Sequence, residues 1–382
     1  MILQMSLDNR RSRFAKWLDR YIGIPLVMGL AIYRPVTRLF RRKPTTLPQR
    51  ILISKLSALG DAVLMLPAIF LLKRNFPQAQ IVFLGGGSVE EFAKLIPAVS
   101  RFEKFSIKAA AGLARERFDL HIDFDQWIRA TAVMAAASRW CRTWGFRSPG
   151  QKRHMAYDRT VVLNLNQHMA ENFWNLAQGA AAQAGAAAVA TSFAQDKEAV
   201  RSQWAKDLLA ATAEVTEPSQ TASSYIVVHP GCGEHGKFRE WPLEAWGKLI
   251  QSEKSRDPAL KIYVTGHGGY EESLGRRLEE WGATSVVGKM SLAQLFPFLK
   301  EARRVYSCNT GIMHLAGFFV DSLVVINGPT DSALWGPLWG GKTVKSPLEC
   351  APCLTWGYDY GCSDPVCLKA IRVEWVIKRV HA

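Results

Sequence analysis

Short apolar runs alternate with helix-like stretches along most of this chain. In the segment 51–67, Ile51 to Ile53 form a run typical of a strand that is buried on both faces. Ser57 to Gly60 then form a turn, and apolar residues recur at helical spacing from Asp61 onward. This order predicts an α/β fold in which Asp61 lies at the carboxyl end of a strand, where such folds bind ligands. The alternative is that Asp61 only complements the positive end of the helix.

The same alternation continues through the first half of the chain. It predicts a helix over 62–75 and another over 167–190. Strands are expected over 81–84, 118–124, 140–146 and 160–163. Gly85 to Gly87 are expected to form a turn. Because no G-x-G-x-x-G spacing occurs there, the sequence does not support a dinucleotide site.

A second α/β unit is expected from residue 225 onward. Its predicted strands cover 225–229, 261–265 and 304–307, and its predicted helices cover 271–279 and 312–319. A chain of 382 residues is too long for one ordinary core. We therefore expect a first segment over 1–46, an N-terminal domain over 47–215 and a C-terminal domain over 216–382.

The strand 225–229 leads into a glycine-rich loop with basic residues. Gly231, Gly236 and Lys237 nearly match a phosphate-binding P-loop, but Phe238 stands where Ser or Thr would bind Mg²⁺. This difference disfavours a P-loop phosphotransferase. Lys237 and Arg239 are still expected to neutralise a phosphate.

The strand 304–307 ends near a second site of this kind. Asn309 and Thr310 are expected to cap a helix that starts near Gly311, and its free amides favour a pyrophosphate. Asp123 and Asp125 form an Asp-x-Asp that can hold a divalent cation, but such a short motif often occurs by chance, and no metal site is predicted.

The chain is basic, with 48 Lys and Arg against 33 Asp and Glu. The excess indicates an anionic partner, which can be nucleic acid, a phospholipid surface or a phosphorylated substrate. No nucleic-acid motif is present. The first segment is rich in basic residues: Arg10, Arg11, Arg13, Lys16, Arg20, Arg34, Arg38, Arg41, Arg42 and Lys43.

These basic residues flank an apolar run over 21–33 that is too short to span a bilayer. The pattern suits a helix lying in the membrane interface. The alternative is a helix hairpin packed on the first domain.

Four of the 7 cysteines cluster near the end of the chain: Cys350, Cys353, Cys362 and Cys367. Because the start of the chain lacks the pattern of a secretory signal, a reducing cytoplasm is expected and disulfides are not. The spacing of the cluster permits a structural zinc site, and packed or free thiols are the alternative.

Taken together, four motifs resemble the heptosyltransferase family, glycosyltransferase family 9. They are Lys55-Leu56-Ser57-Ala58-Leu59-Gly60-Asp61, the loop from His229-Pro230-Gly231 to Arg239-Glu240-Trp241-Pro242, the segment Asn309 to Ala316, and Gly328-Pro329-Thr330-Asp331 with Trp335-Gly336-Pro337. The resemblance covers most of residues 49–377. It implies a GT-B architecture of two Rossmann-like domains, with the acceptor on the first and the nucleotide-sugar on the second.

The resemblance also implies roles for single residues. Asp61 would be the catalytic base of an inverting, metal-independent transfer that needs no cofactor. Lys55, Ser57 and Gly60 would lie on the acceptor side. The donor side would be formed by Lys237, Arg239, Glu272 at the ribose, Met290 at the base, Asn309, Thr310, Gly311 and His314. On its own, His314 is more typical of a buried core residue.

The expected reaction moves a sugar, most readily heptose from ADP-heptose, onto a lipid-anchored core oligosaccharide. It would take place on the inner face of the bacterial inner membrane, beside an anionic surface. Relatives usually carry Asp where this chain has Asn309, which donates as well as accepts hydrogen bonds. The alternative function is therefore a catalytically silent, nucleotide-sugar-binding partner of another assembly enzyme.

Overall fold

The computed structural model divides the chain into two compact units, Met1–Ser202 and Gln203–Ala382. It describes residues 19, 21–39, 47–138, 141–186, 191–210, 225–234, 236–354 and 364–381, and only the backbone of 33–39 and 381. The expected domain boundary at 215/216, most of the basic residues of the first segment, and Cys362 lie outside the described residues.

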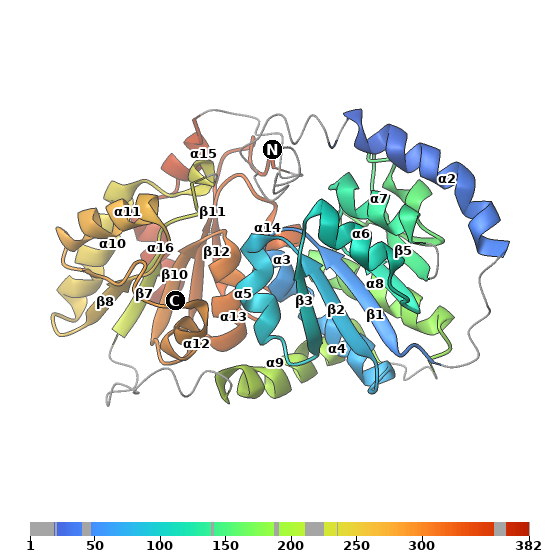
Figure 1. The fold of residues 1–382 in the computed structure, drawn as a ribbon. Coiled ribbons are helices and arrows are strands. Elements are labelled where there is room, and N and C mark those ends of the chain that lie inside the picture. The colour runs from blue at the N-terminus through green and yellow to red at the C-terminus, as the bar shows by residue number, and fades with distance from the viewer. Residues whose placement is uncertain are drawn as a thin grey trace. The chain divides into compact units, whose positions relative to one another are not determined.

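The first unit contains a parallel sheet of six strands in the order β3-β2-β1-β4-β5-β6 (Figure 1). This is the order of a doubly wound Rossmann fold, whose topological switch point lies between the first and fourth strands. The strands are β1 (Arg50–Lys55), β2 (Gln80–Gly85), β3 (Val99–Lys104), β4 (Leu120–Asp123), β5 (Arg142–Arg147) and β6 (Arg159–Val162).

Helices cover this sheet because its central strands are apolar on both faces. Leu52, Val82 and Leu84 pack against Leu113 and Met134 of two helices on one face. The helices of the unit are α2 (Gly23–Leu39), α3 (Leu59–Leu64), α4 (Leu66–Asn75), α5 (Gly87–Leu95), α6 (Ile107–Arg115), α7 (Arg129–Ala137), the 3-10 helix η2 (Arg153–Ala156) and α8 (Met169–Gln183).

Helix α8 packs through an aromatic cluster. The ring of Phe173 lies 5.8 Å from that of Phe124 and 6.1 Å from that of Phe146, between ring centroids. All three side chains are fully buried. Burial of one such side chain stabilises a fold by roughly 1.5–3 kcal/mol. This cluster therefore holds in place the end of the sheet at which β4 ends.

The second unit repeats the topology of the first. Its six parallel strands follow the order β12-β11-β10-β7-β8-β9, which places the switch point between β7 and β10. The strands are β7 (Tyr225–His229), β8 (Lys261–Val264), β9 (Thr284–Ser285), β10 (Arg304–Cys308), β11 (Leu323–Asn327) and β12 (Lys342–Lys345).

The core of the second unit lies around β7, β8 and β11. Trp246, Ile250 and Val376 are buried against Val228 and Val264 of the sheet. The helices are η4 (Lys237–Arg239), α10 (Leu243–Arg256), α11 (Gly269–Glu279), α12 (Leu292–Lys300), α13 (Gly311–Phe319), α14 (Ser332–Trp335), α15 (Val366–Lys369) and α16 (Val373–His381); α9 (Phe193–Ala210) crosses the division between the units.

The predicted strands are confirmed, with small differences at their ends, and so is the turn at Gly85–Gly87, since β2 ends at Gly85 and α5 begins at Gly87. The single helix expected over 62–75 is wrong. It is two helices, α3 and α4, which meet at Met65, and Pro67 occupies the first turn of α4, where a missing amide hydrogen is tolerated. Strand β3 was not predicted because its exposed, charged residues do not alternate cleanly.

Helix α2 extends beyond the apolar run that predicted it. It packs against α7 and η2 of the first unit (Figure 1). Gly23 allows the close approach, because a Cβ there would lie 2.9 Å from the Cβ of Arg129. In the part of the chain that the structure describes, no helix is long and apolar enough to cross a membrane.

Candidate functional site

The first cluster of polar side chains lies at the switch point of the first unit. Strand β1 ends at Lys55 and its neighbour β4 ends at Asp123, with Ser54 opposite Asp123 in the parallel register. Because parallel strands end at the same edge of a sheet, the residues that follow them converge there. This convergence brings together two stretches about 70 positions apart in the sequence.

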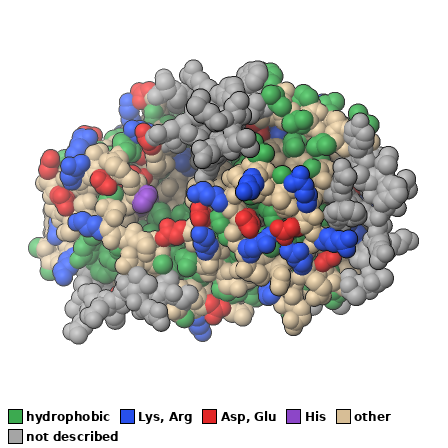
Figure 2. All heavy atoms as spheres, in the orientation of Figure 1, with side chains coloured by type: hydrophobic (Ala, Val, Ile, Leu, Met, Phe, Trp, Pro, Cys, Tyr) green, Lys and Arg blue, Asp and Glu red, His purple; other side chains and the backbone are tan. Residues whose placement is uncertain are grey.

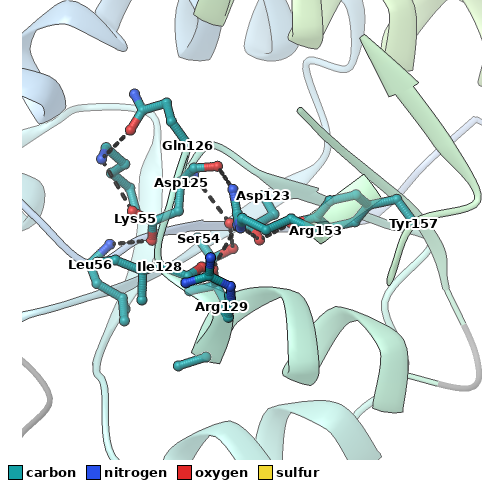
Figure 3. Close-up of polar contacts among 12 residues, drawn as sticks. Ser54, Lys55, Leu56, Asp123, Asp125, Gln126, Ile128, Arg129, Arg153 and Tyr157 are labelled. Carbon is teal, nitrogen blue, oxygen red and sulfur yellow. Dashed lines mark hydrogen bonds and ion pairs between the residues drawn. The ribbon is translucent and has the colours of Figure 1, made fainter. Parts of the chain in front are cut away.

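Lys55 is the centre of this cluster and is fully buried. Its Nζ lies 2.6 Å from Oδ2 of Asp61. It also lies 3.2 Å from Oδ1 of Asp125 and donates to Oε1 of Gln126 at 3.1 Å (Figure 3). Burial alone would lower the pKa of Lys55, but the charges of Asp61 and Asp125 outweigh it and raise that pKa. The ammonium is therefore a permanent positive charge beneath Asp61.

Asp123 and Asp125 are buried and bind the protein's own donors. Oδ2 of Asp123 accepts hydrogen bonds from Arg153 and from the hydroxyl of Tyr157, both at 2.6 Å. Oδ2 of Asp125 accepts the amide hydrogen of Leu56 at 2.9 Å. The two carboxylates do not form a shared cation site, and burial raises the pKa of Asp125 to about 6.

Asp61 differs from the other members of this cluster because its side chain is 18% exposed, whereas those of Lys55, Asp125 and Arg153 are 0% exposed. It lies in the first turn of α3, yet its Oδ2 is held by the Lys55 ammonium. A carboxylate that is fixed on one side and open to solvent on the other can accept a proton from a bound molecule. Ser57 and Gly60 are buried and form the backbone path that leads to it.

The second cluster lies at the matching place in the second unit. The loop after β7 meets the end of β10, where Nη1 of Arg239 donates to the carbonyl oxygen of Asn309 at 3.1 Å. Asn309 is buried and donates through Nδ2 to the carbonyl oxygen of Trp335 at 3.3 Å. The structure thus joins Arg239 and Asn309, which the sequence assigned to the same site.

Lys237 is exposed, and its Nζ lies 3.7 Å from the ring centroid of Tyr270. The Tyr270 hydroxyl in turn donates to Oε2 of Glu240 at 2.6 Å. Lys237 opens the 3-10 helix η4, and the next helix, α10, begins only at Leu243. The loop therefore lacks the direct entry into a helix that defines a P-loop, and the resemblance to that motif is wrong in structure as well as at Phe238.

Two neighbouring carboxylates at the start of α11 have different surroundings. Glu271 is buried and accepts the amide hydrogens of Gly233 and His267, both at 2.8 Å, so it ties two loops together. Glu272 is exposed, and a Cβ on Gly288 would lie 3.3 Å from its Oε1. Glu272 therefore lies at the turn that leads to Met290 and is open to a ligand.

The start of α13 differs from the prediction that Asn309 and Thr310 cap this helix. Thr310 occupies the N-cap position, but its side chain makes no capping hydrogen bond, and the side chain of Asn309 binds Trp335 instead. Gly311 is the first residue of the helix, and His314 is buried within it. The first amides of α13 are thus not capped by these side chains and suit an anion.

Comparison of the sequence with known protein families identifies the family of this chain. The model of glycosyltransferase family 9 (heptosyltransferase) matches residues 107–362, well over half of the chain. The chain belongs to glycosyltransferase family 9. It is thus a glycosyltransferase-family protein with its polar clusters at the two switch points.

Curated members of the family are similar to this chain over most of their length. Lipopolysaccharide heptosyltransferase 1 of Escherichia coli K12 is 27% identical over 328 residues, which cover 78% of this chain and 94% of that protein. The Pseudomonas aeruginosa PAO1 protein of the same name is 24% identical over 319 residues, which cover 80% of this chain and 86% of that protein.

Solved structures of the family share the fold. The E. coli heptosyltransferase WaaC with ADP matches with a TM-score of 0.64 at 21% identity, over 87% of this chain and 99% of that one. E. coli ADP-heptose lps heptosyltransferase II matches with a TM-score of 0.63 at 17% identity, over 87% and 97%. The predicted GT-B fold of two Rossmann-like domains is confirmed.

Sequence reasoning did not find several members of these two polar clusters. Gln126, Arg153 and Tyr157 bind Lys55 or Asp123, but they lie in segments without a recognisable motif. Glu271 could not be distinguished from Glu272 by pattern. Among the described cysteines Cys350 and Cys353 are exposed and Cys367 is buried, and the described residues contain no group of three metal-binding side chains.

Proposed function

We propose that this chain is an inverting glycosyltransferase that moves heptose from ADP-heptose onto a lipopolysaccharide core or a related lipid-linked glycan. The observation that carries the proposal is the partly exposed carboxylate of Asp61, held 2.6 Å from a buried ammonium at the switch point of the first unit. The second unit presents the basic side chains of Lys237 and Arg239 and the uncapped first amides of α13 at its own switch point, as a diphosphate requires.

In the proposed reaction Asp61 takes the proton of the acceptor hydroxyl. The hydroxyl oxygen forms a bond to the anomeric carbon while the bond from that carbon to the diphosphate breaks, and ADP leaves with the electron pair. Attack opposite the leaving group inverts the configuration. Lys55 keeps a positive charge beside Asp61 and holds the carboxylate in one orientation.

On the donor side, Arg239 and Lys237 would offset the negative charge that develops on the leaving diphosphate, so that the reaction needs no bound metal. The uncapped amides of α13, at Gly311, would bind the same group. Glu272 would accept hydrogen bonds from the ribose, and Met290 would border the base. One relative supports an adenine nucleotide donor, since E. coli heptosyltransferase WaaC was solved both with ADP and with ADP-2-deoxy-2-fluoro heptose.

The acceptor of such a reaction is anchored in a lipid bilayer, and the curated relatives are lipopolysaccharide heptosyltransferases. We therefore place the protein at the inner face of the bacterial inner membrane, as a peripheral protein. Its charge of +15 suits an anionic membrane surface.

A second candidate function is a catalytically silent partner that binds a nucleotide-sugar. Asn309, at a position where relatives usually carry Asp, favours it. The geometry of Asp61 opposes it, because a silent protein has no need for an oriented and open carboxylate.

Thermal-shift titration with ADP-, UDP-, GDP- and CDP-sugars, each with and without EDTA, tests the donor site, because a ligand that binds the folded state raises its stability. Selective stabilisation by an ADP-sugar that persists in EDTA is the expected result. Transfer to a lipid-free core oligosaccharide, with product configuration read by NMR, then separates the enzyme from the silent partner. Binding without transfer would support the silent partner.

A further inference from the structure

One face of helix α2, together with Tyr21 and Ile22 just before the helix, is apolar and exposed to solvent. Tyr21, Ile22, Leu26, Met28 and Ile32 are between 42% and 75% exposed, and Pro25 beside them is exposed as well. At helical spacing these residues form one continuous stripe, which we call the α2 stripe. Figure 2 shows hydrophobic side chains gathered at the upper edge of the first unit, where α2 lies in Figure 1.

The stripe faces outward because the opposite side of α2 is fastened to the first unit. Val27 is buried against α7, and Gly23 allows the close contact with Arg129. Asp19 accepts the amide hydrogens of Arg129 and Ala130 through Oδ1, at 2.7 and 3.2 Å. Its Oδ2 lies 3.1 Å from Nη1 of Arg129, and both side chains are less than 10% exposed.

This fastening fixes the rotation of α2 about its own axis and also its place relative to the site. Asp19 caps α7, and α7 begins at Arg129, directly after the loop that carries Asp125 and Gln126. The stripe and the Lys55 cluster are therefore built on the two ends of one short segment, residues 125–129.

The charge of the sequence around α2 indicates which kind of partner binds the α2 stripe. Residues 1–46 contain ten Lys and Arg but only two acidic residues, Asp8 and Asp19. Asp19 is already paired with Arg129. An apolar stripe with cationic flanks fits the boundary between anionic headgroups and acyl chains. It is a poor fit for a second copy of this chain, because two such segments repel each other.

The face of the first unit formed by β3, α5 and α6 is different. Across β3, α5 and α6 the basic residues alternate with acidic partners, as in the pairs Arg101–Glu116 and Lys104–Glu90 (Figure 2). Such a balanced surface has little attraction for an anionic bilayer.

We propose that the α2 stripe docks this protein on an anionic bilayer and holds the Lys55–Asp61 cluster beside the lipid-anchored acceptor. The inference rests on the membrane location proposed above and names the surface that produces it.

The test is co-sedimentation of the full chain with vesicles of phosphatidylethanolamine and phosphatidylglycerol, compared with vesicles of phosphatidylcholine alone. The test variant carries Ile22→Ser, Leu26→Ser and Ile32→Ser. The matched control carries Ile107→Ser and Val162→Ser, which remove two exposed apolar side chains elsewhere on the first unit. Circular dichroism and transfer to a lipid-free acceptor show whether each variant is folded.

We expect the parent to bind the anionic vesicles, and less strongly at high salt. The triple variant should bind these vesicles at least roughly tenfold more weakly than the parent, because it loses three partly inserted side chains. The control should bind like the parent. Transfer to the lipid-free acceptor should survive in all three, whereas Asp61→Asn should lose transfer and keep vesicle binding, which separates this inference from the proposed reaction.

The inference is overturned if the parent does not sediment with anionic vesicles, or if the folded triple variant binds them as the parent does. It is also overturned if sedimentation velocity shows a parent dimer that the triple substitution dissociates, since the stripe is then a contact between two copies.

Discussion

The two units have the same strand order, yet their switch points carry different chemistry. In the first unit the strand ends hold buried charges that are bound to one another: Lys55, Asp123, Asp125 and Arg153. In the second unit the strand ends hold glycines, backbone amides and the basic side chains of Lys237 and Arg239, of which Lys237 is exposed.

This difference shows what the fold supplies and what the residues supply. The doubly wound sheet provides two places where loops converge. A rigid network of buried charges suits one oriented proton acceptor. A cationic loop suits an incoming diphosphate, whose charge it meets only on binding. Substitutions in the first unit should therefore affect stability first, and substitutions in the second should affect donor binding first.

The largest expected effect is on the buried ammonium. Lys55→Met leaves Asp61 and Asp125 without their shared cation, and we expect it to lower the free energy of unfolding by about 3–5 kcal/mol. Lys237→Met is the matched control in the second unit and should change that energy by less than about 0.5 kcal/mol, since Lys237 is exposed. Urea unfolding measures both. Equal losses of unfolding free energy in the two variants would contradict the difference between the two units.

The next effect is the pH dependence of stability at Asp125. Burial raises the pKa of this carboxyl to about 6 in the folded chain, while the unfolded value is about 4. The folded state therefore binds more protons between these values, and its stability falls as the pH rises through them. Relative to Asp125→Asn, the parent should lose up to about 3 kcal/mol between about pH 4 and pH 7.

Chemical unfolding across this pH range checks the prediction. The difference between the two curves removes the contribution of groups that lie away from Asp125. Parallel curves would show that Lys55 keeps Asp125 ionised throughout.

A smaller effect is expected at Arg239. Arg239→Ala removes the charge-assisted contact to the diphosphate that we propose, and we expect ADP to bind roughly tenfold to hundredfold more weakly, as measured by calorimetry. Arg303→Ala is the control, because Arg303 lies before β10, at the opposite end of that strand. If the two variants bind ADP with equal affinity, Arg239 does not contact the diphosphate.

The smallest effect is expected at Asn309. Asn309→Asp introduces the residue that the family resemblance leads us to expect here, but it loses the hydrogen bond from Nδ2 to the carbonyl oxygen of Trp335. We expect a loss of about 1 kcal/mol in the free energy of unfolding, measured in urea. A gain in stability would mean that Arg239, which binds the backbone of Asn309, also pairs with the new carboxylate.

The sequence predicted the sheets and the positions of both clusters, because apolar strands followed by glycine or by polar residues mark strand ends. It identified Asp61, Arg239 and Asn309 by motif. The sequence could not predict that Arg153 and Tyr157 donate hydrogen bonds to the carboxylate of Asp123, because these contacts depend on tertiary packing. For the same reason it could not predict that Glu271, and not Glu272, is buried.

The proposed reaction depends on Asp61 accepting the proton of the acceptor hydroxyl. The direct measurement is the rate of heptose transfer from ADP-heptose to a lipid-free core oligosaccharide by the Asp61→Asn variant, with ADP affinity measured in parallel. We expect a loss of roughly 10²–10⁴-fold in kcat with unchanged ADP affinity. Transfer at the parental rate by this variant would contradict it.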